Sequence, residues 1–200
     1  MHTEVRIALN ASVEQTGRLL NLQKAFAQVC NALAPIVQRN RCWNRVTLHH
    51  LAYRDLRERF PALGSQMVCN AIYSVSRTSR LLFQHPDSPF NVARLEGKPL
   101  PMLRFTDTCP VYFDRHTLSV KDGRLSMYTL DGRVRFDVAV DGAHEAAFQQ
   151  KKVREIVLSR SADEYELRFR FSESADGDVQ PIDAARPAHI PEYVVIEESP

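Results

Sequence analysis

Apolar and polar residues alternate in a short stretch near the N-terminus, where residues 5–10 read Val-Arg-Ile-Ala-Leu-Asn. Alternation with a period of two is typical of a strand with one buried face. The period then lengthens to three or four residues, which predicts a helix. Its apolar positions are Leu19, Leu22, Phe26, Val29, Leu33 and Ile36. Ser12 and Gln15 have the spacing of a capping box at its start, and Pro35 is expected to kink or end it.

Two more helices are predicted before residue 83. Thr47 is expected to cap the first, which runs to about Phe60 and is stopped by Pro61. Ser65 is expected to cap the second, which runs to about Leu82. The four prolines within residues 84–101 then predict a connecting loop.

From residue 101 onward the pattern returns to a period of two. Strands are predicted at residues 101–105, 111–114, 117–120, 124–130, 133–140, 153–159 and 164–172, with a short helix at 144–152. Asp122-Gly123 and Asp131-Gly132 are turn signals, because glycine adopts positive φ at no steric cost. Many short antiparallel strands with one apolar face predict a small barrel, and hence an α+β fold.

Composition is ordinary for a globular protein, with 44% hydrophobic and 25% charged residues. No apolar run is long enough to span a bilayer, and the first ten residues lack the features of a signal peptide. We therefore expect a cytoplasmic protein without membrane association.

Charge is unevenly distributed along the chain. Residues 1–110 hold fourteen Lys and Arg against seven Asp and Glu, whereas residues 111–200 hold twelve against seventeen. Residues 172–200 hold one basic residue, Arg186, against seven acids. A basic front and an acidic end indicate a polyanion partner and a solvated tail. The alternative is a helical surface that is rich in arginine without binding anything.

Residues 39–80 favour the polyanion partner. They contain eight arginines and no lysine, with Asp55 and Glu58 as their acids. Arginine pairs with phosphates, amide side chains read base edges, and aromatic rings stack on bases. The candidate nucleic-acid-binding residues are Arg39, Arg41, Trp43, Arg45, His49, His50, Tyr53, Arg54, Arg57, Gln66, Asn70, Tyr73, Arg77, Arg80, Lys151, Lys152 and Arg154.

Motifs of catalysis and metal binding are missing from the sequence. The four cysteines form no C-x-x-C pair, and we expect them to be buried, reduced thiols. His49 and His50 are adjacent, so on a helix they cannot share a metal ion. Walker, G-x-S-x-G, G-x-G-x-x-G and H-E-x-x-H motifs are all absent. We predict no catalytic residues, no metal and no cofactor.

Four segments, taken in order, resemble the N-terminal half of TnpB (OrfB), the transposon-encoded RNA-guided nucleases related to type V CRISPR effectors. The segments are Leu19–Asn31, Tyr53–Leu63, Ser65–Val75 and Val111–Val138. The last is the most specific, because Thr129-Leu130 followed by Gly132-Arg133 fits the family pattern closely. Residues 153–171 also resemble the hairpin that closes this half of the family.

The resemblance implies an OB-like wedge barrel with a helical recognition lobe inserted after its first strand. Residues 1–10 and 100–172 would form the barrel, 11–83 the lobe, 84–99 a linker and 173–200 an acidic, loosely ordered tail. The implied partners are a structured or guide RNA, a target duplex DNA and a separate nuclease or effector subunit. By position, residues 47–50 and 65–70 would read the DNA motif, although Cys69 and Asn70 stand where the family often has glutamines.

The nuclease half of the family has no counterpart in these 200 residues. Its first catalytic aspartate would follow the barrel, where Asp183 is a faint echo, and a two-metal site needs carboxylates from several strands. We therefore predict a nucleic-acid-binding protein that is not itself an enzyme, acting as a recognition subunit or remnant. Two alternatives stay open: a regulator or inhibitor of an RNA-guided system, and the front piece of a split nuclease.

Overall fold

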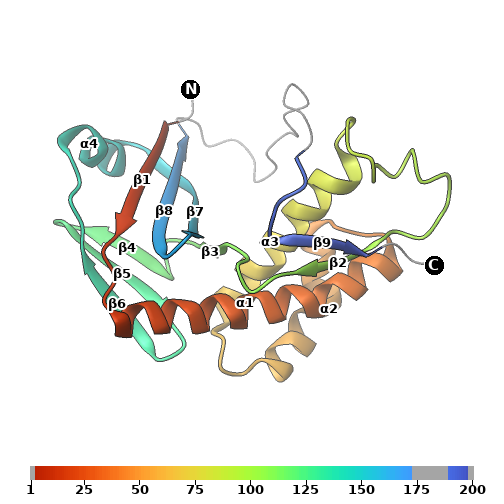
Figure 1. The fold of residues 1–200 in the computed structure, drawn as a ribbon, viewed down its shortest axis with the longest axis horizontal. Coiled ribbons are helices and arrows are strands. Elements are labelled where there is room, and N and C mark those ends of the chain that lie inside the picture. The colour runs from red at the N-terminus through yellow and green to blue at the C-terminus, as the bar shows by residue number, and fades with distance from the viewer. Residues whose placement is uncertain (1–2, 173–188, 198–200) are drawn as a thin grey trace. The chain divides into compact units, whose positions relative to one another are not determined.

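The computed structural model describes residues 3–172 and 189–197. These residues form an α+β fold of four helices and three antiparallel sheets (Figure 1). The chain divides into two compact units. We call residues 1–24 and 110–177 the sheet unit, and residues 25–109 and 178–200 the helical unit. The predicted fold class is confirmed, but the sheets of the described residues do not close into a barrel.

A four-stranded antiparallel sheet forms the larger part of the sheet unit. Its strands, in spatial order, are β1 (Thr3–Leu9), β8 (Glu164–Ser172), β7 (Lys152–Ser161) and β3 (Val111–Phe113). β1 has its predicted alternation, since Val5, Ile7 and Leu9 are buried. Val5 lies opposite Phe169 and Leu9 opposite Tyr165, so the apolar residues of β1 and β8 share one face.

A second sheet in this unit is a three-stranded meander. Its strands are β4 (Leu118–Lys121), β5 (Arg124–Thr129) and β6 (Gly132–Asp137). Asp122 and Gly123 join β4 to β5 with φ values of 50° and 71°, as the turn signal predicted. The short helix α4 (Gly142–Gln150) follows, and its Phe148 ring meets the Phe169 ring edge-on at 4.9 Å.

The first helix is longer than predicted. α1 runs from Val13 to Asn40 without a break, and its residues 13–24 belong to the sheet unit and 25–40 to the helical unit. The expectation that Pro35 would kink or end the helix is wrong. Proline costs one backbone hydrogen bond, but Leu33, Ala34 and Val37 around it are all buried, and this burial favours continued helix.

Two further helices belong to the helical unit. α2 spans Arg45–Arg59 and α3 spans Ser65–Gln84. α2 starts three residues earlier than predicted, because the Asn44 side chain, not that of Thr47, is its cap. Asn44 Oδ1 accepts from the Thr47 backbone N–H at 3.1 Å, which satisfies a donor that the helix leaves free. Among the helices of the described residues, none is long and apolar enough to cross a membrane.

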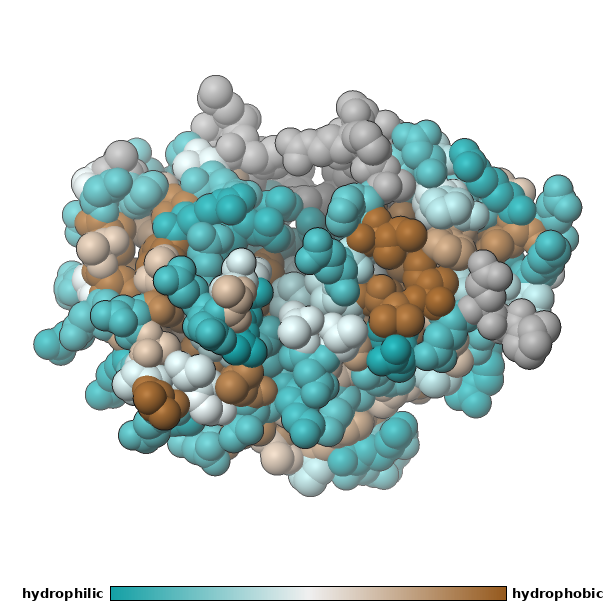
Figure 2. Space-filling view, in the orientation of Figure 1, coloured by the Kyte–Doolittle hydropathy of each residue, from teal (hydrophilic) through white to brown (hydrophobic). Residues whose placement is uncertain are grey.

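The C-terminal segment corrects two predictions at once. Val194–Glu197 form β9, which pairs with β2 (Met102–Phe105) in a two-stranded sheet. Residues 194–197 are therefore not loosely ordered, and residues 173–188 of the predicted tail lie outside the described residues. β2 was assigned to the barrel, but its strand partner is β9 in the helical unit. Apolar side chains gather over this small sheet (Figure 2), where Val195 is exposed.

Candidate nucleic-acid interface

The exposed side of α2 carries the group of basic and aromatic side chains that best fits a nucleic-acid interface. The opposite side of the helix packs into the core through its buried residues Leu48, Ala52 and Leu56. We call six residues the α2 face: Arg45, His50 and Arg54, which are exposed, and His49, Tyr53 and Tyr73 of α3, which are half-buried. All six belong to the helical unit.

Aromatic rings are already arranged in pairs on the α2 face. The His49 and Tyr53 rings stack with centroids 4.5 Å apart and planes 15° apart. The Arg45 guanidinium lies 5.3 Å from the centre of the Tyr73 ring, a cation–π contact. Unpaired bases stack on flat aromatic rings of this kind that lie beside a cation.

Positive charge on the α2 face is only partly neutralised. Arg54 has a side chain 96% exposed and lies 3.5 Å from Glu58, an ion pair that solvent screens strongly. Arg45 and His50 are also exposed, and so is Arg39 at the end of α1. A phosphate can therefore approach these side chains without displacing a buried partner.

Three other predicted residues, Arg41, Trp43 and Arg57, make contacts within the fold. Arg57 is half-buried and donates to the backbone carbonyl of Leu63, which ties α2 to the loop after it. Arg41 donates to the carbonyl of Lys98 at 2.8 Å. The Trp43 ring packs against Phe83, with centroids 5.4 Å apart. Arg57 and Trp43 are therefore less available for nucleic acid than the sequence suggested, whereas Arg41 stays exposed.

By helical spacing, a polar stripe was expected on α3 from Gln66, Asn70, Tyr73, Arg77 and Arg80, but this stripe is not an open surface. α3 is buried on nearly all sides, since twelve of its residues, including Ser74, Ser76 and Thr78, are buried. Asn70 is 8% exposed and its amide points to the sulfur of Met67 at 3.7 Å, so it cannot read a base edge in this arrangement. Arg77 and Arg80 are half-buried and have partners within the protein.

Gln66 and Tyr73 are the other two positions of that stripe, and both are half-buried. Helical spacing placed the residues of the stripe on one side of α3, but spacing cannot show whether other parts of the protein cover that side. Small buried residues such as Ser74, Ser76 and Thr78 allow close packing around the helix.

The remaining three predicted residues belong to the sheet unit. Lys151 Nζ donates to the Thr3 hydroxyl at 2.6 Å, so this lysine joins the end of α4 to β1. Arg154 is half-buried and has a partner, whereas Lys152 is exposed. These residues are therefore not part of the α2 face.

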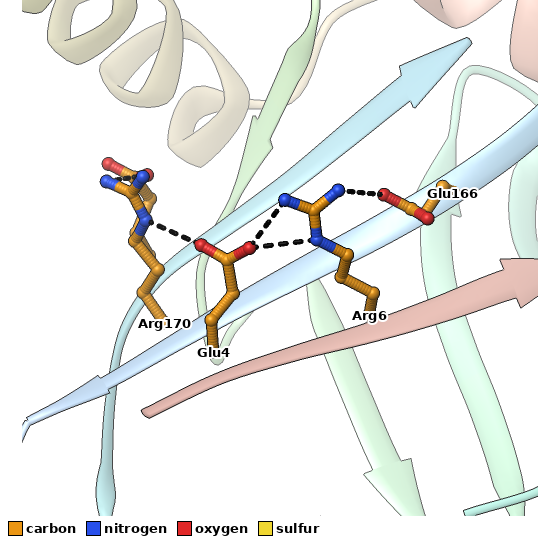
Figure 3. Close-up of polar contacts among 5 residues, drawn as sticks. Glu4, Arg6, Glu166 and Arg170 are labelled. Atoms are coloured by element: carbon orange, nitrogen blue, oxygen red, sulfur yellow. Dashed lines mark hydrogen bonds and ion pairs between the residues drawn. The ribbon is translucent and has the colours of Figure 1, made fainter. Parts of the chain in front are cut away.

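The outer face of the four-stranded sheet carries arginines that sequence reasoning did not single out, and here acids neutralise them (Figure 3). Glu4 accepts from Arg6 at 2.9 Å and from Arg170 at 3.4 Å. Arg6 also lies 3.6 Å from Glu166, and Arg170 lies 3.6 Å from the buried carboxylate of Glu155.

The Glu4 carboxyl responds to these neighbours. Burial alone would raise its pKa, but hydrogen bonds from Arg6 and Arg170 and the nearby charge of Arg168 outweigh burial. The net result is a pKa below the usual value of a glutamate. We call the alternating charges of Glu4, Arg6, Glu166, Arg170 and Glu155 the ion-pair ladder. The ladder stabilises the sheet and leaves little net charge for a polyanion.

The histidines, cysteines and acids of the described residues form no candidate metal site. No three His, Cys, Asp or Glu side chains come together in residues 3–172 and 189–197. Cys30 and Cys109 are buried and Cys42 and Cys69 half-buried, all four as free thiols. Burial and the neighbouring Cys109 raise the pKa of Cys30 well above that of a free thiol, so Cys30 is a poor nucleophile.

Comparison with known proteins gave no relative: no protein-family model matches the chain, and no curated protein matches it.

Proposed function

We propose that this protein binds RNA through the α2 face and carries no nuclease centre of its own. The observation that carries the proposal is the stacked His49–Tyr53 pair beside exposed arginines. Rings of this kind stack on bases and guanidinium groups pair with phosphates, so one surface offers both contacts that single-stranded or looped RNA requires.

The architecture is consistent with the TnpB resemblance in one respect. β1 pairs with β8, about 160 residues later, so the helices are an insertion between the first strand and the rest of its sheet. A helical lobe inserted after the first strand is what the resemblance implied. The OB-like wedge barrel, the guide RNA, the target DNA and a separate nuclease subunit remain parts of this proposal.

The test compares two triple variants in binding to a structured RNA with an unpaired loop, measured by fluorescence anisotropy over a range of salt concentrations. Replacing Arg45, His50 and Arg54 by Ala is expected to weaken binding by about tenfold or more and to flatten the salt dependence. The control replaces Arg94, Arg115 and Arg124, which are exposed and do not belong to the α2 face, by Ala. Equal weakening in both variants would mean that binding reflects overall charge and not this surface.

The proposal that the protein carries no nuclease centre of its own has a separate test. The purified chain with its bound RNA, supplied with Mg²⁺ or Mn²⁺, is expected to leave RNA and DNA substrates intact. Cleavage that co-purifies with the wild-type chain over several columns would contradict the proposal, because a two-metal centre needs a cluster of carboxylates.

A further inference from the structure

A shallow hollow of about 690 Å³ lies in the sheet unit between the start of α1 and β6. Three arginines line it, Arg18 from α1 and Arg133 and Arg135 from β6. Glu14 is also in the lining and offsets one of these charges. The lining side chains therefore carry a net positive charge at neutral pH.

Neutral groups, not carboxylates, hold Arg18 in place. Its Nη2 donates to the Thr129 hydroxyl at 2.8 Å and to the backbone carbonyls of Asp131 and Gly132 at 3.0 and 3.1 Å. A carbonyl orients a guanidinium but does not cancel its charge. Arg18 is therefore fixed and still fully cationic.

Arg133 is held in the same way. Its Nε donates to the Ser126 hydroxyl at 2.8 Å and its Nη2 to the Ser126 carbonyl at 2.9 Å. Arg135 is exposed on the same strand. Within the described residues none of the three hollow arginines lies within ion-pair distance of a carboxylate, in contrast to Arg6 and Arg170 of the ion-pair ladder.

The two walls of the hollow are joined by hydrogen bonds. Gln15 accepts from the Ser12 N–H at 2.8 Å, as the capping box predicted, and its amide also donates to the Arg135 carbonyl at 2.9 Å. The start of α1 is thus attached to β6. Side chains that are ordered before binding lose less entropy when a ligand arrives.

We propose that this hollow binds a phosphate group. The guanidinium fork matches the oxygens of a phosphate, and charge-assisted hydrogen bonds to it are stronger than neutral ones. The partial positive charge at the start of α1 adds to the attraction. The hollow lies in the other unit from the α2 face, and its binding of phosphate does not depend on the function of that face.

The test uses the full-length ¹⁵N-labelled chain, titrated with inorganic pyrophosphate at constant ionic strength and followed by ¹H–¹⁵N correlation spectra. Saturable shifts are expected at the amides of residues 12–15 and 133–135. The double variant Arg133→Gln with Arg135→Gln is expected to bind at least about tenfold more weakly, the loss of one charge-assisted hydrogen bond. Arg135→Gln alone changes an exposed side chain, so it reports on binding even if the double variant is unstable.

The matched control is Arg115→Gln with Arg124→Gln, which removes the same charge from exposed positions outside the hollow. This control is expected to keep wild-type affinity. Absence of saturable shifts, or equal weakening in the control, would overturn the proposal.

A competition experiment identifies the source of the phosphate. If an RNA oligonucleotide shifts the same amides and displaces pyrophosphate, the hollow takes a backbone phosphate of RNA. If pyrophosphate binds but RNA leaves these amides unchanged, the hollow takes a free phosphate compound. The triple variant of the α2 face is expected to keep its pyrophosphate affinity. RNA binding by the α2 face and phosphate binding by the hollow can therefore fail separately.

Discussion

The arginines of this protein differ in the groups that accept their hydrogen bonds. Arg6 and Arg170 meet carboxylates in the ion-pair ladder, whereas Arg18 and Arg57 donate to backbone carbonyls. An acceptor with a full negative charge cancels the field of a guanidinium at a distance, and a carbonyl does not. The basic character of a surface therefore depends on the acceptors as much as on the number of arginines.

The lowered pKa of Glu4 leads to a prediction about how the stability of the protein depends on pH. Because its pKa is lowered in the folded protein, its contribution to stability is present above the pKa of an unfolded glutamate and is lost as pH falls through the folded value. Glu4→Gln is expected to reduce the free energy of unfolding at pH 7 by less than about 1 kcal/mol, because solvent screens the pair. The difference in the free energy of unfolding between Glu4→Gln and the wild type should shrink below about pH 4.5.

Urea unfolding at pH 7, 5, 4 and 3 measures this effect. Glu164→Gln is the control, since Glu164 lies at the exposed start of the same strand, β8. A Glu4→Gln difference that stayed constant down to pH 3 would show that the carboxylate charge is not the cause.

Single residues also show where prediction from sequence reaches its limit. The sequence made Arg54 and Arg57 equal candidates for nucleic-acid binding, but it could not show that the loop after α2 brings the Leu63 carbonyl to Arg57. The hollow arginines were missed for the same reason. Arg133 follows a recognised Asp-Gly turn and Arg18 a recognised capping box, yet only tertiary structure brings the two signals together.

Helices and strands were predicted well wherever one face is buried and the other exposed. β1 and the residues of β4, β5, β6 and β8 follow the alternation that predicted them. α3 shows the opposite case: Gln66, Arg77 and Arg80 were predicted to lie on an exposed stripe, but the helix is buried on nearly all sides. β9 was missed because its apolar run is only three residues long, residues 194–196, stands in an acidic segment and has its partner strand about ninety residues earlier.

The orientation of α2 has a direct test. Leu56 is fully buried and Leu51 is half exposed on the same helix. Leu56→Ala is expected to lower the free energy of unfolding by about 2–5 kcal/mol, through lost apolar burial and the cavity that remains. Leu51→Ala should change it by about 0.5 kcal/mol or less. Similar losses for both, in chemical denaturation, would mean that α2 presents a different face to solvent than described.

At the scale of the whole molecule, contacts between distant parts of the sequence complete both units. β1 pairs with β8 in the sheet unit, and β2 pairs with β9 in the helical unit. The Arg104 side chain donates to Glu197 at 2.9 Å across the second pair. Thr106 extends this contact, since its N–H donates to the Tyr193 carbonyl at 2.9 Å.

The attachment of the C-terminal segment can be tested with neighbouring valines of β9. Val194 is 6% exposed and Val195 37% exposed. Val194→Ala is expected to destabilise the protein by about 1–3 kcal/mol, and Val195→Ala by about 0.5 kcal/mol or less. Thermal unfolding measured by circular dichroism compares the two. If Val194→Ala proved as neutral as Val195→Ala, the strand pairing would not contribute to stability.

The pairing of β1 with β8 also bears on how the chain folds during synthesis. A ribosome adds roughly 5–20 residues per second, so β1 is made about 10 to 30 seconds before its partner strand. Contacts between α2 and α3 are local and can form during that interval. During this interval Val5, Ile7 and Leu9 lack the neighbouring strand whose apolar side chains they pack beside, so the newly made β1 segment exposes apolar surface until β8 is synthesised.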